Sequence, residues 1–179
     1  MKFFTSIFLF ALISVSAVFS QSAEIVEKTV STEKLTYGTA AYFTAVAMGY
    51  ISDDDSEEDA VDAWKKIGEQ YSKPAIEAEI SADDFINFEN LAWLCYFTWN
   101  VPDSLMMKFF PSPRYAFKQL RNGGVISTSF DPKRIPTGRE FLNVVTDCID
   151  FYEVRNFHEY EKIFCRYFIF SFLGVCFFC

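Results

Sequence analysis

Apolar residues near the end of the chain recur with the period of an α-helix. They stand at i, i+4, i+7 and i+11, on one face of a helix: Phe141, Val145, Cys148 and Tyr152. Thr137 precedes them, and Glu140 follows it at the spacing of a capping box, in which each side chain accepts a backbone N–H that the helix leaves free. We therefore predict a helix from Thr137 to about Tyr152.

Two earlier segments begin in the same way. Thr36 precedes a helix-compatible stretch that continues to about Tyr50. Ser81 and Asp84 repeat the capping-box spacing, and a second helix is predicted from there. Its apolar stripe consists of Phe85, Phe88, Ala92, Cys95 and Trp99. Because the middle of this segment is apolar almost all round, we expect this helix to be central and its stripe to be buried against that of the last helix.

Two further helices are predicted between these starts. One runs from Glu57 to Tyr71 and has apolar residues at helical spacing. The other runs from Ser112 to about Asn122 and ends at two glycines, where a left-handed C-cap is easily formed. The predicted fold is all-α, a small bundle of repeated capped helix–loop–helix units over residues 35–153. The predicted caps are 45 and 56 residues apart, a spacing typical of repeat modules.

The N-terminus has the three-part plan of a secretory signal peptide. Lys2 is followed by an apolar run over residues 3–19, which is at the short limit for a membrane-spanning helix. We predict that residues 1–20 are a signal peptide cleaved after Ser20 and that residues 21–34 are a linker. The protein is then expected to be exported to the periplasm, the cell envelope or the cell surface.

The C-terminal residues 154–179 form a predicted apolar tail outside the domain. From Ile163 to Cys179 nearly every residue is apolar, and Arg166 is the one charge. The uncharged segment after it is too short for an ordinary transmembrane helix. Two interpretations stay open: an interfacial anchor that contacts the membrane, or a non-native end produced by a frameshift.

Charge is segregated along the chain. Residues 51–90 contain thirteen acids against three lysines, whereas residues 104–139 contain seven bases against one acid. Arg114, Lys118 and Arg121 fall on one face of the predicted helix, and Arg139 lies further along. These four cations are the candidate binding residues for an anionic partner. The alternative is a solvated helix face that pairs with the acidic segment of the same chain. The net charge of −8 argues against nucleic-acid binding.

Side chains suited to catalysis or metal binding are sparse. The one histidine, His158, has no nucleophile near it, and no pair among the many carboxylates stands out as general acid and base. The acidic run over residues 53–59 lacks the glycine of a calcium loop. We predict no catalytic residue, no metal site and no cofactor. Export would permit a disulfide between Cys95 and Cys148, but two buried free thiols are the favoured interpretation.

One ordered set of residues resembles the S-layer homology module. That pattern runs aromatic-Ala, a helix ending at Gly-Ile, Phe-x-Pro, and then Ile-Thr-Arg-Ala-Glu-Phe. The matching residues are Tyr115-Ala116, Leu120, Gly124-Val125-Ile126, Phe130, Pro132, Thr137 and Glu140-Phe141. A degenerate earlier copy is carried by Ala63-Trp64, Ile67, Ile80-Ser81 and Phe85, and the helix after Thr36 would be the second half of a copy before that.

The resemblance implies a helical bundle whose copies pack about a shared axis and attach noncovalently to a cell-wall polysaccharide. The sequence departs from the family pattern at Gly138-Arg139, where the arginine is shifted by one position. It also has Ser127-Thr128-Ser129 where a glycine is expected. The expected function is that of an exported, non-enzymatic envelope protein that binds an anionic envelope glycan or another envelope protein. Two alternatives are a structural self-assembly module, packed through the acidic and basic halves, and a fragment of a carbohydrate-active enzyme.

Overall fold

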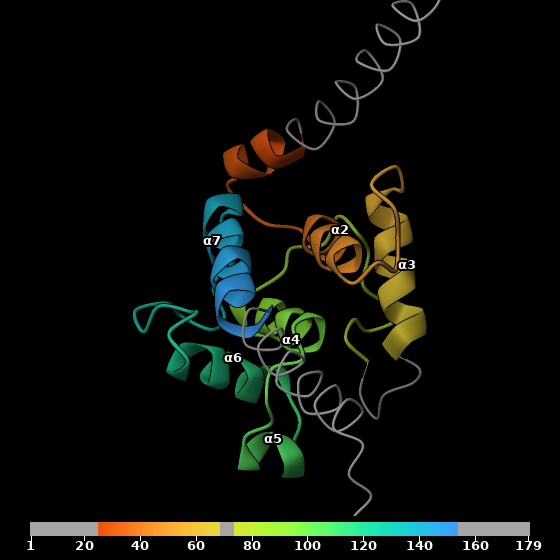
Figure 1. The fold of residues 1–179 in the computed structure, drawn as a ribbon. Coiled ribbons are helices and arrows are strands. Elements are labelled where there is room, and N and C mark those ends of the chain that lie inside the picture. Colours follow the sequence, from red (N-terminus) through yellow and green to blue (C-terminus); the bar gives the residue numbers. More distant parts are fainter. Residues whose placement is uncertain (1–24, 69–73, 154–179) are drawn as a thin grey trace, which may run out of the picture.

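A computed structural model describes residues 25–68 and 74–153, and this part of the chain is all-α, as predicted (Figure 1). A short helix is present at residues 25–31. It is followed by α2 (Tyr37–Ala47), α3 (Glu57–Gly68), α4 (Phe88–Thr98), α5 (Leu105–Phe109), α6 (Pro113–Asn122), α7 (Gly138–Cys148) and the π-helix η1 (Ile149–Glu153). The predicted signal peptide and apolar tail lie outside the described residues.

Helix α4 is the central helix, as its composition predicted. Leu91, Ala92, Trp93, Leu94 and Cys95 are all buried. Helices α2 and α6 both pack against α4, and α3 packs against α2 (Figure 1). A helix without a solvated face is stable only where neighbours cover it on all sides, so the position of α4 follows from its sequence.

The three capped helices α2, α4 and α7 begin at one place, which we call the hub. It consists of the loops over residues 32–36, 82–87 and 132–137. In each case the first helical residue donates its backbone N–H to a carbonyl in the loop before another capped helix. These bonds are Tyr37 to Asp84 at 2.8 Å, Phe88 to Arg134 at 3.1 Å and Gly138 to Thr32 at 2.9 Å. They form a closed cycle and satisfy N–H groups that a helix N-terminus leaves free.

The second capped helix begins later than predicted. Ser81 does not cap a helix; its N–H donates to the Asp84 carboxylate at 2.7 Å within a turn. The cap of α4 is Asn87, whose side chain accepts from the Asn90 N–H at 2.9 Å. Backbone bonds to the α2 segment, such as Ile86 N–H to Leu35 O, hold the intervening residues outside a helix. The correct cap also makes the spacing between the three caps nearly equal, at 51 and 50 residues.

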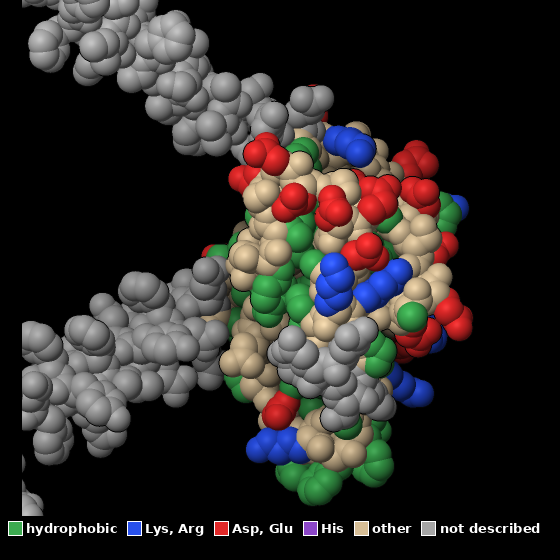
Figure 2. All heavy atoms as spheres, turned by 90° about the vertical axis from the view of Figure 1, so that its right-hand side faces the viewer, with side chains coloured by type: hydrophobic (Ala, Val, Ile, Leu, Met, Phe, Trp, Pro, Cys, Tyr) green, Lys and Arg blue, Asp and Glu red, His purple; other side chains and the backbone are tan. Residues whose placement is uncertain are grey.

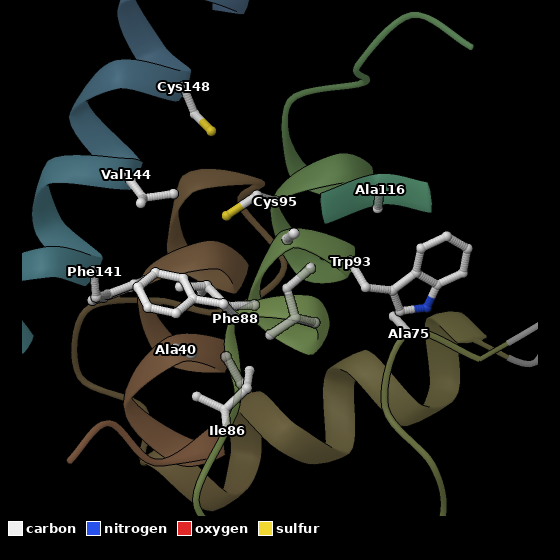
Figure 3. Packing of buried hydrophobic residues seen from close by; sticks show 14 of the residues in the cluster. Ala40, Ala75, Ile86, Phe88, Trp93, Cys95, Ala116, Phe141, Val144 and Cys148 are labelled. Atoms are coloured by element: carbon white, nitrogen blue, oxygen red, sulfur yellow. The ribbon is translucent and has the colours of Figure 1, made fainter. Parts of the chain in front are cut away.

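Phe85 was predicted to join the buried stripe, and this was wrong. Its side chain is 54% exposed because it lies before the helix, in the hub loop. The other members of the stripe are buried as expected, and Cys95 faces Cys148 of α7 across the core (Figure 3). In α7, Val145 was predicted to lie in the buried stripe but is only half-buried. Its neighbour Val144 is buried instead.

The described part of the predicted linker, residues 25–34, packs against the rest of the domain. Residues 25–31 are helical, and Thr29 is buried. The backbone of Thr29 lies close to Gly138 at the start of α7. This approach is possible because Gly138 has no side chain, and a Cβ at that position would overlap the backbone carbonyl of Thr29. The polar composition of residues 21–34 hid this role. A short helix that contacts the domain through its backbone and one threonine side chain can pack there without an apolar stripe.

The starts of the other helices agree with the sequence, whereas α2 ends three residues before Tyr50 and α7 gives way to η1 after Cys148. Helix α2 begins after Thr36, as predicted, and ends at Ala47. The predicted capping box of α7 is present, with the Glu140 N–H donating to Thr137 Oγ1 and the Thr137 N–H donating to Glu140 Oε2. Gly124, after α6, has a φ of 84°, the left-handed conformation expected there.

Candidate functional site

The predicted cationic residues of α6 lie on its exposed side. The opposite side, formed by Ala116, Phe117 and Leu120, packs against α4. Arg114 and Lys118 are exposed and Arg121 is half-buried, so their spacing of i, i+4 and i+7 places all three on one flank. We call these three residues the basic face.

Aromatic rings support the side chains of the basic face. Lys118 Nζ lies 5.4 Å from the centre of the Tyr115 ring, and the Arg121 guanidinium lies 5.5 Å from that of Phe117. A cation within about 6 Å of a ring centre is attracted by the electrons of the ring face. These contacts orient the cations without neutralising their charge.

The ion pairs of the described residues do not involve the basic face. They join Lys28 to Glu57 at 3.6 Å, Lys133 to Glu89 at 2.6 Å, and Arg134 to Glu140 at 2.8 Å. Within residues 25–68 and 74–153, the alternative expectation that α6 pairs with the acidic segment therefore has no ion pair to support it. The three cations of α6 are available to an external anion as far as the described chain is concerned.

Arg139 does not join the basic face. It is the second residue of α7, beside the contact between Gly138 and Thr29. The other end of α7 is the one that approaches α6, where the Tyr152 hydroxyl lies close to Gly123. Arg139 is thus separated from the basic face by most of the length of α7, about 16 Å for eleven residues. The sequence pattern grouped it with α6 only because it is close along the chain.

The acidic residues gather around the start of α3, as their position in the sequence predicted. Figure 2 shows acidic side chains over the upper part of one face of the molecule, at the end where α3 begins. Glu57, Glu58 and Asp59 occupy the first turn of α3, where negative charge stabilises the helix dipole. The Ser56 hydroxyl donates to Asp59 Oδ2 at 2.7 Å and the Ser56 N–H donates to the same oxygen at 3.1 Å, and these two bonds lower the pKa of Asp59.

A cavity of about 220 Å³ lies between the helix at residues 25–31, α2 and the start of α3. Lys28 and Glu57 stand on its wall beside apolar and hydroxyl-bearing side chains; the other lining residues are Ile25, Thr29, Thr32, Thr39, Tyr42, Asp55 and Ser56. The sequence analysis missed it because one wall comes from the segment taken as a linker. The signal was present in the helical spacing of Ile25, Thr29 and Thr32.

A second feature that the sequence analysis missed is an exposed apolar surface on α5. We call it the apolar ridge: Leu105, Met106, Phe109 and Phe110, which are 74%, 53%, 70% and 64% exposed. In Figure 2 the hydrophobic side chains at the lower tip of the molecule lie where Figure 1 places α5. The signal was the run of apolar residues after Ser104, interrupted by Lys108 alone.

Cys95 and Cys148 are free thiols, buried side by side between α4 and α7 (Figure 3). This confirms the favoured interpretation of the sequence. A hydrogen bond between the two thiols, together with burial, raises the pKa of Cys95 well above its usual value. The Cys95 thiol is therefore held in the protonated form, which reacts slowly.

Neither a metal site nor a membrane span is found in the part of the chain that the structure describes. No group of three or more His, Cys, Asp or Glu residues there is arranged to hold a metal ion. Of the helices described, none is both long enough and apolar enough to cross a bilayer.

Comparisons with known proteins gave no match. The chain was compared with models of protein families, with curated protein sequences and with solved structures, and none of the three searches found a similar protein.

Proposed function

We propose that this chain is an exported, non-enzymatic protein of the cell envelope that binds an anionic envelope component, a glycan or another envelope protein, through the basic face. The observation that carries the proposal is the set of three cations on one flank of α6, without an ion pair to any described acid.

The charge pattern favours binding to an extended anion over internal pairing. Several like charges fixed on one helix raise the local potential and attract a polyanion more strongly than a single charge does. The rings of Tyr115 and Phe117 already restrict the side chains of Lys118 and Arg121, so these side chains lose less conformational entropy on binding. Such binding weakens with salt, because exposed charges are screened over about 8–10 Å at physiological ionic strength.

The arrangement of the three capped helices supports the resemblance to S-layer homology modules. That resemblance implies copies that pack about a shared axis. The closed cycle of hydrogen bonds at the hub, with caps 51 and 50 residues apart, is what three such copies would produce. We therefore propose that the domain is a degenerate tandem array of this type, and that its binding surface has moved to α6.

Binding to isolated cell envelopes tests the proposal. The variant Arg114→Glu, Lys118→Glu, Arg121→Glu should bind at least about tenfold more weakly than the wild type, because three attractive charges become repulsive. A matched variant with the same change in net charge, Lys65→Glu, Lys66→Glu, Arg139→Glu, should bind normally. Wild-type binding should also fall as salt rises. Equal binding by the two triple variants would remove the basic face from the proposal.

Export has its own test. If residues 1–20 are a signal peptide, the protein recovered from the envelope begins at Gln21. The intact mass of the recovered protein measures this directly, and a mass that includes Met1 would contradict cleavage.

A self-assembly module is the second candidate function. The acids around the start of α3 and the cations of α6 lie on different parts of the surface, so a second copy could bring them together. Sedimentation at low and high salt distinguishes the two functions. Salt-sensitive self-association without envelope binding would favour assembly, whereas a salt-independent monomer that binds envelopes would exclude it.

A further inference from the structure

The apolar ridge is unusual for a small helical domain because four neighbouring large apolar side chains face solvent. Leu105 is 74% exposed and Phe109 is 70% exposed, although most large apolar residues of the described chain are buried. Exposed apolar groups that are scattered need no explanation, but a contiguous group of this kind marks a surface that binds something.

The ridge is held firmly by the rest of the fold. Met107 points the other way and is 2% exposed, so α5 is anchored to the core through its middle residue. The Gln119 side chain of α6 accepts from the Ser104 N–H at 3.2 Å and donates to the Pro102 carbonyl. Ser104 itself caps α5, accepting from the Met107 N–H. The exposed side chains of the ridge thus project from a short helix that hydrogen bonds and packing hold in place against α6.

Positive charge lies within the ridge and on the helix that packs against it. Lys108 lies within it and is exposed, and the basic face lies on α6, which packs against α5. No acid occurs between Ser104 and Phe130 in the sequence. The nearest acid along the chain, Asp103, accepts a hydrogen bond from the Tyr96 hydroxyl. Burial and this bond raise the pKa of Tyr96, so the phenol stays a donor to Asp103.

We propose that the anionic component bound by this protein is the phospholipid surface of a membrane. The apolar ridge enters the boundary between headgroups and acyl chains, while Lys108 and the basic face contact the headgroup phosphates. This inference rests on the proposed function, because it uses the same cations of α6 and names their partner.

The apolar residues decide between a lipid surface and a wall glycan. A hydrated polysaccharide offers phosphates or carboxylates to the basic face, but it leaves four large apolar side chains in water. A bilayer removes those side chains from water and supplies the anions as well. Only the lipid surface makes use of both features.

Vesicle binding by the full chain, recovered from the envelope, is the first test. Binding to vesicles that contain phosphatidylglycerol should exceed binding to phosphatidylcholine vesicles. Phe109→Gln, Phe110→Gln should lower it at least about tenfold, because two large apolar surfaces no longer leave water. The matched control is Phe85→Gln, which changes an aromatic residue that is also exposed, at 54%, but lies at the hub. Equal losses in the two variants, or no loss in either, would overturn the proposal.

A local probe removes any contribution from other apolar segments of the chain. A tryptophan introduced by Phe109→Trp should be quenched by vesicles of brominated phosphatidylglycerol, and a tryptophan introduced by Phe85→Trp should not. Changes in fluorescence are read as differences from the wild type, whose own tryptophans Trp64, Trp93 and Trp99 are buried. Absence of quenching at position 109 would exclude insertion of the ridge.

A lipid-free preparation of cell wall separates this inference from the proposed function. If Phe109→Gln, Phe110→Gln and the charge-reversed variant of the basic face both lower vesicle binding, and lipid-free wall does not bind the wild type, both proposals hold. If lipid-free wall binds through the basic face while vesicles do not bind, the lipid inference fails and the envelope function stands. If neither material binds, both fail.

Discussion

At the hub, three loops exchange backbone hydrogen bonds, and the first residue of each of α2, α4 and α7 donates its N–H to a loop carbonyl. At the apolar ridge, a five-residue helix holds four large apolar side chains in solvent. The hub lies next to the packed core of α2, α4 and α7, whereas the ridge lies at one tip of the molecule (Figure 1). The difference indicates that the exposed ridge side chains contribute little to the free energy of folding and are free to contact a partner.

Replacing a phenylalanine by alanine should give the largest difference in stability between the core beside the hub and the apolar ridge. Phe141 is fully buried and its ring meets that of Phe43 edge to face at a centroid distance of 5.5 Å. Phe141→Ala should lower the free energy of unfolding by about 3–5 kcal/mol, because it leaves a cavity in the core. Phe109→Ala should change it by about 0.5 kcal/mol or less, as at other exposed positions. Urea denaturation measures both, and similar losses would show that the ridge is part of the core.

A methyl group at Gly138 should be the next largest disturbance of the hub. Its Cβ would overlap the Thr29 carbonyl, so the helix at residues 25–31 must move away from α7. We expect Gly138→Ala to cost about 1–3 kcal/mol, as overpacking typically does. Hydrogen exchange should show faster exchange in residues 25–31 and unchanged exchange in α5.

Gly49→Ala is the control for the effect of replacing a glycine by alanine where no neighbouring atom is in the way. Gly49 has a φ of 68° and open space around its Cα, so this variant should cost about 1–2 kcal/mol from backbone strain only. It should leave the exchange of residues 25–31 as in the wild type. Unchanged exchange in Gly138→Ala would mean that this helix does not depend on the glycine contact.

Helix caps give a smaller contrast. Thr137→Ala removes the capping box of α7 and should cost about 1 kcal/mol in global stability. Ser104→Ala removes the cap of α5 and should loosen the ridge locally while leaving the free energy of global unfolding almost unchanged. Thermal melts combined with hydrogen exchange distinguish the two effects. A global loss in Ser104→Ala as large as that in Thr137→Ala would contradict the division into two regions.

The smallest expected effect is the pH dependence of the hub. The Arg134 guanidinium donates two hydrogen bonds to Glu140, and this pair lowers the pKa of Glu140 below its usual value. A carboxyl with a lowered pKa stabilises the folded state above its unfolded-state pKa of about 4.3, and the contribution is lost as pH falls through the folded-state value. Glu140→Gln should therefore flatten the acid side of the curve of stability against pH.

Arg134→Lys serves as the matched variant for this test. It keeps the charge but cannot form the two-pronged bond to Glu140, so its acid limb should lie between those of the wild type and Glu140→Gln. Denaturant melts between pH 6 and acid conditions measure the curves. An acid limb that is the same in all three proteins would show that the pair contributes nothing to the stability of the hub.

The comparison also shows which parts of the fold local sequence could predict. Thr137 and Glu140 form a capping box within four residues, and that box is present in the structure. Ser81 and Asp84 have the same spacing and make a turn, because backbone bonds with the α2 segment hold the residues before Asn87 outside a helix. A cap signal is a local preference, and its outcome depends on which carbonyls the tertiary structure brings near.

The candidate site also contains features that local sequence could predict and features that it could not. The i, i+4, i+7 spacing of Arg114, Lys118 and Arg121 was sufficient to place them together on α6. Arg139, the fourth candidate, lies on α7 instead, because residues that are close along the chain can be carried apart by the length of a helix. The apolar ridge was missed because the sequence does not say which of several apolar runs the fold leaves uncovered.

By itself, the sequence determined the helical class, the central place of α4, the caps at Thr36 and Thr137, and the charge on α6. Each follows from hydrophobic periodicity, from a side chain that caps its own helix, or from residues one helical turn apart. Tertiary structure alone decided the cap at Asn87, the docking of residues 25–31, the closed hub and the exposure of α5. These depend on contacts between segments far apart in the chain, and only the packed fold settles which backbone groups and which apolar side chains find partners.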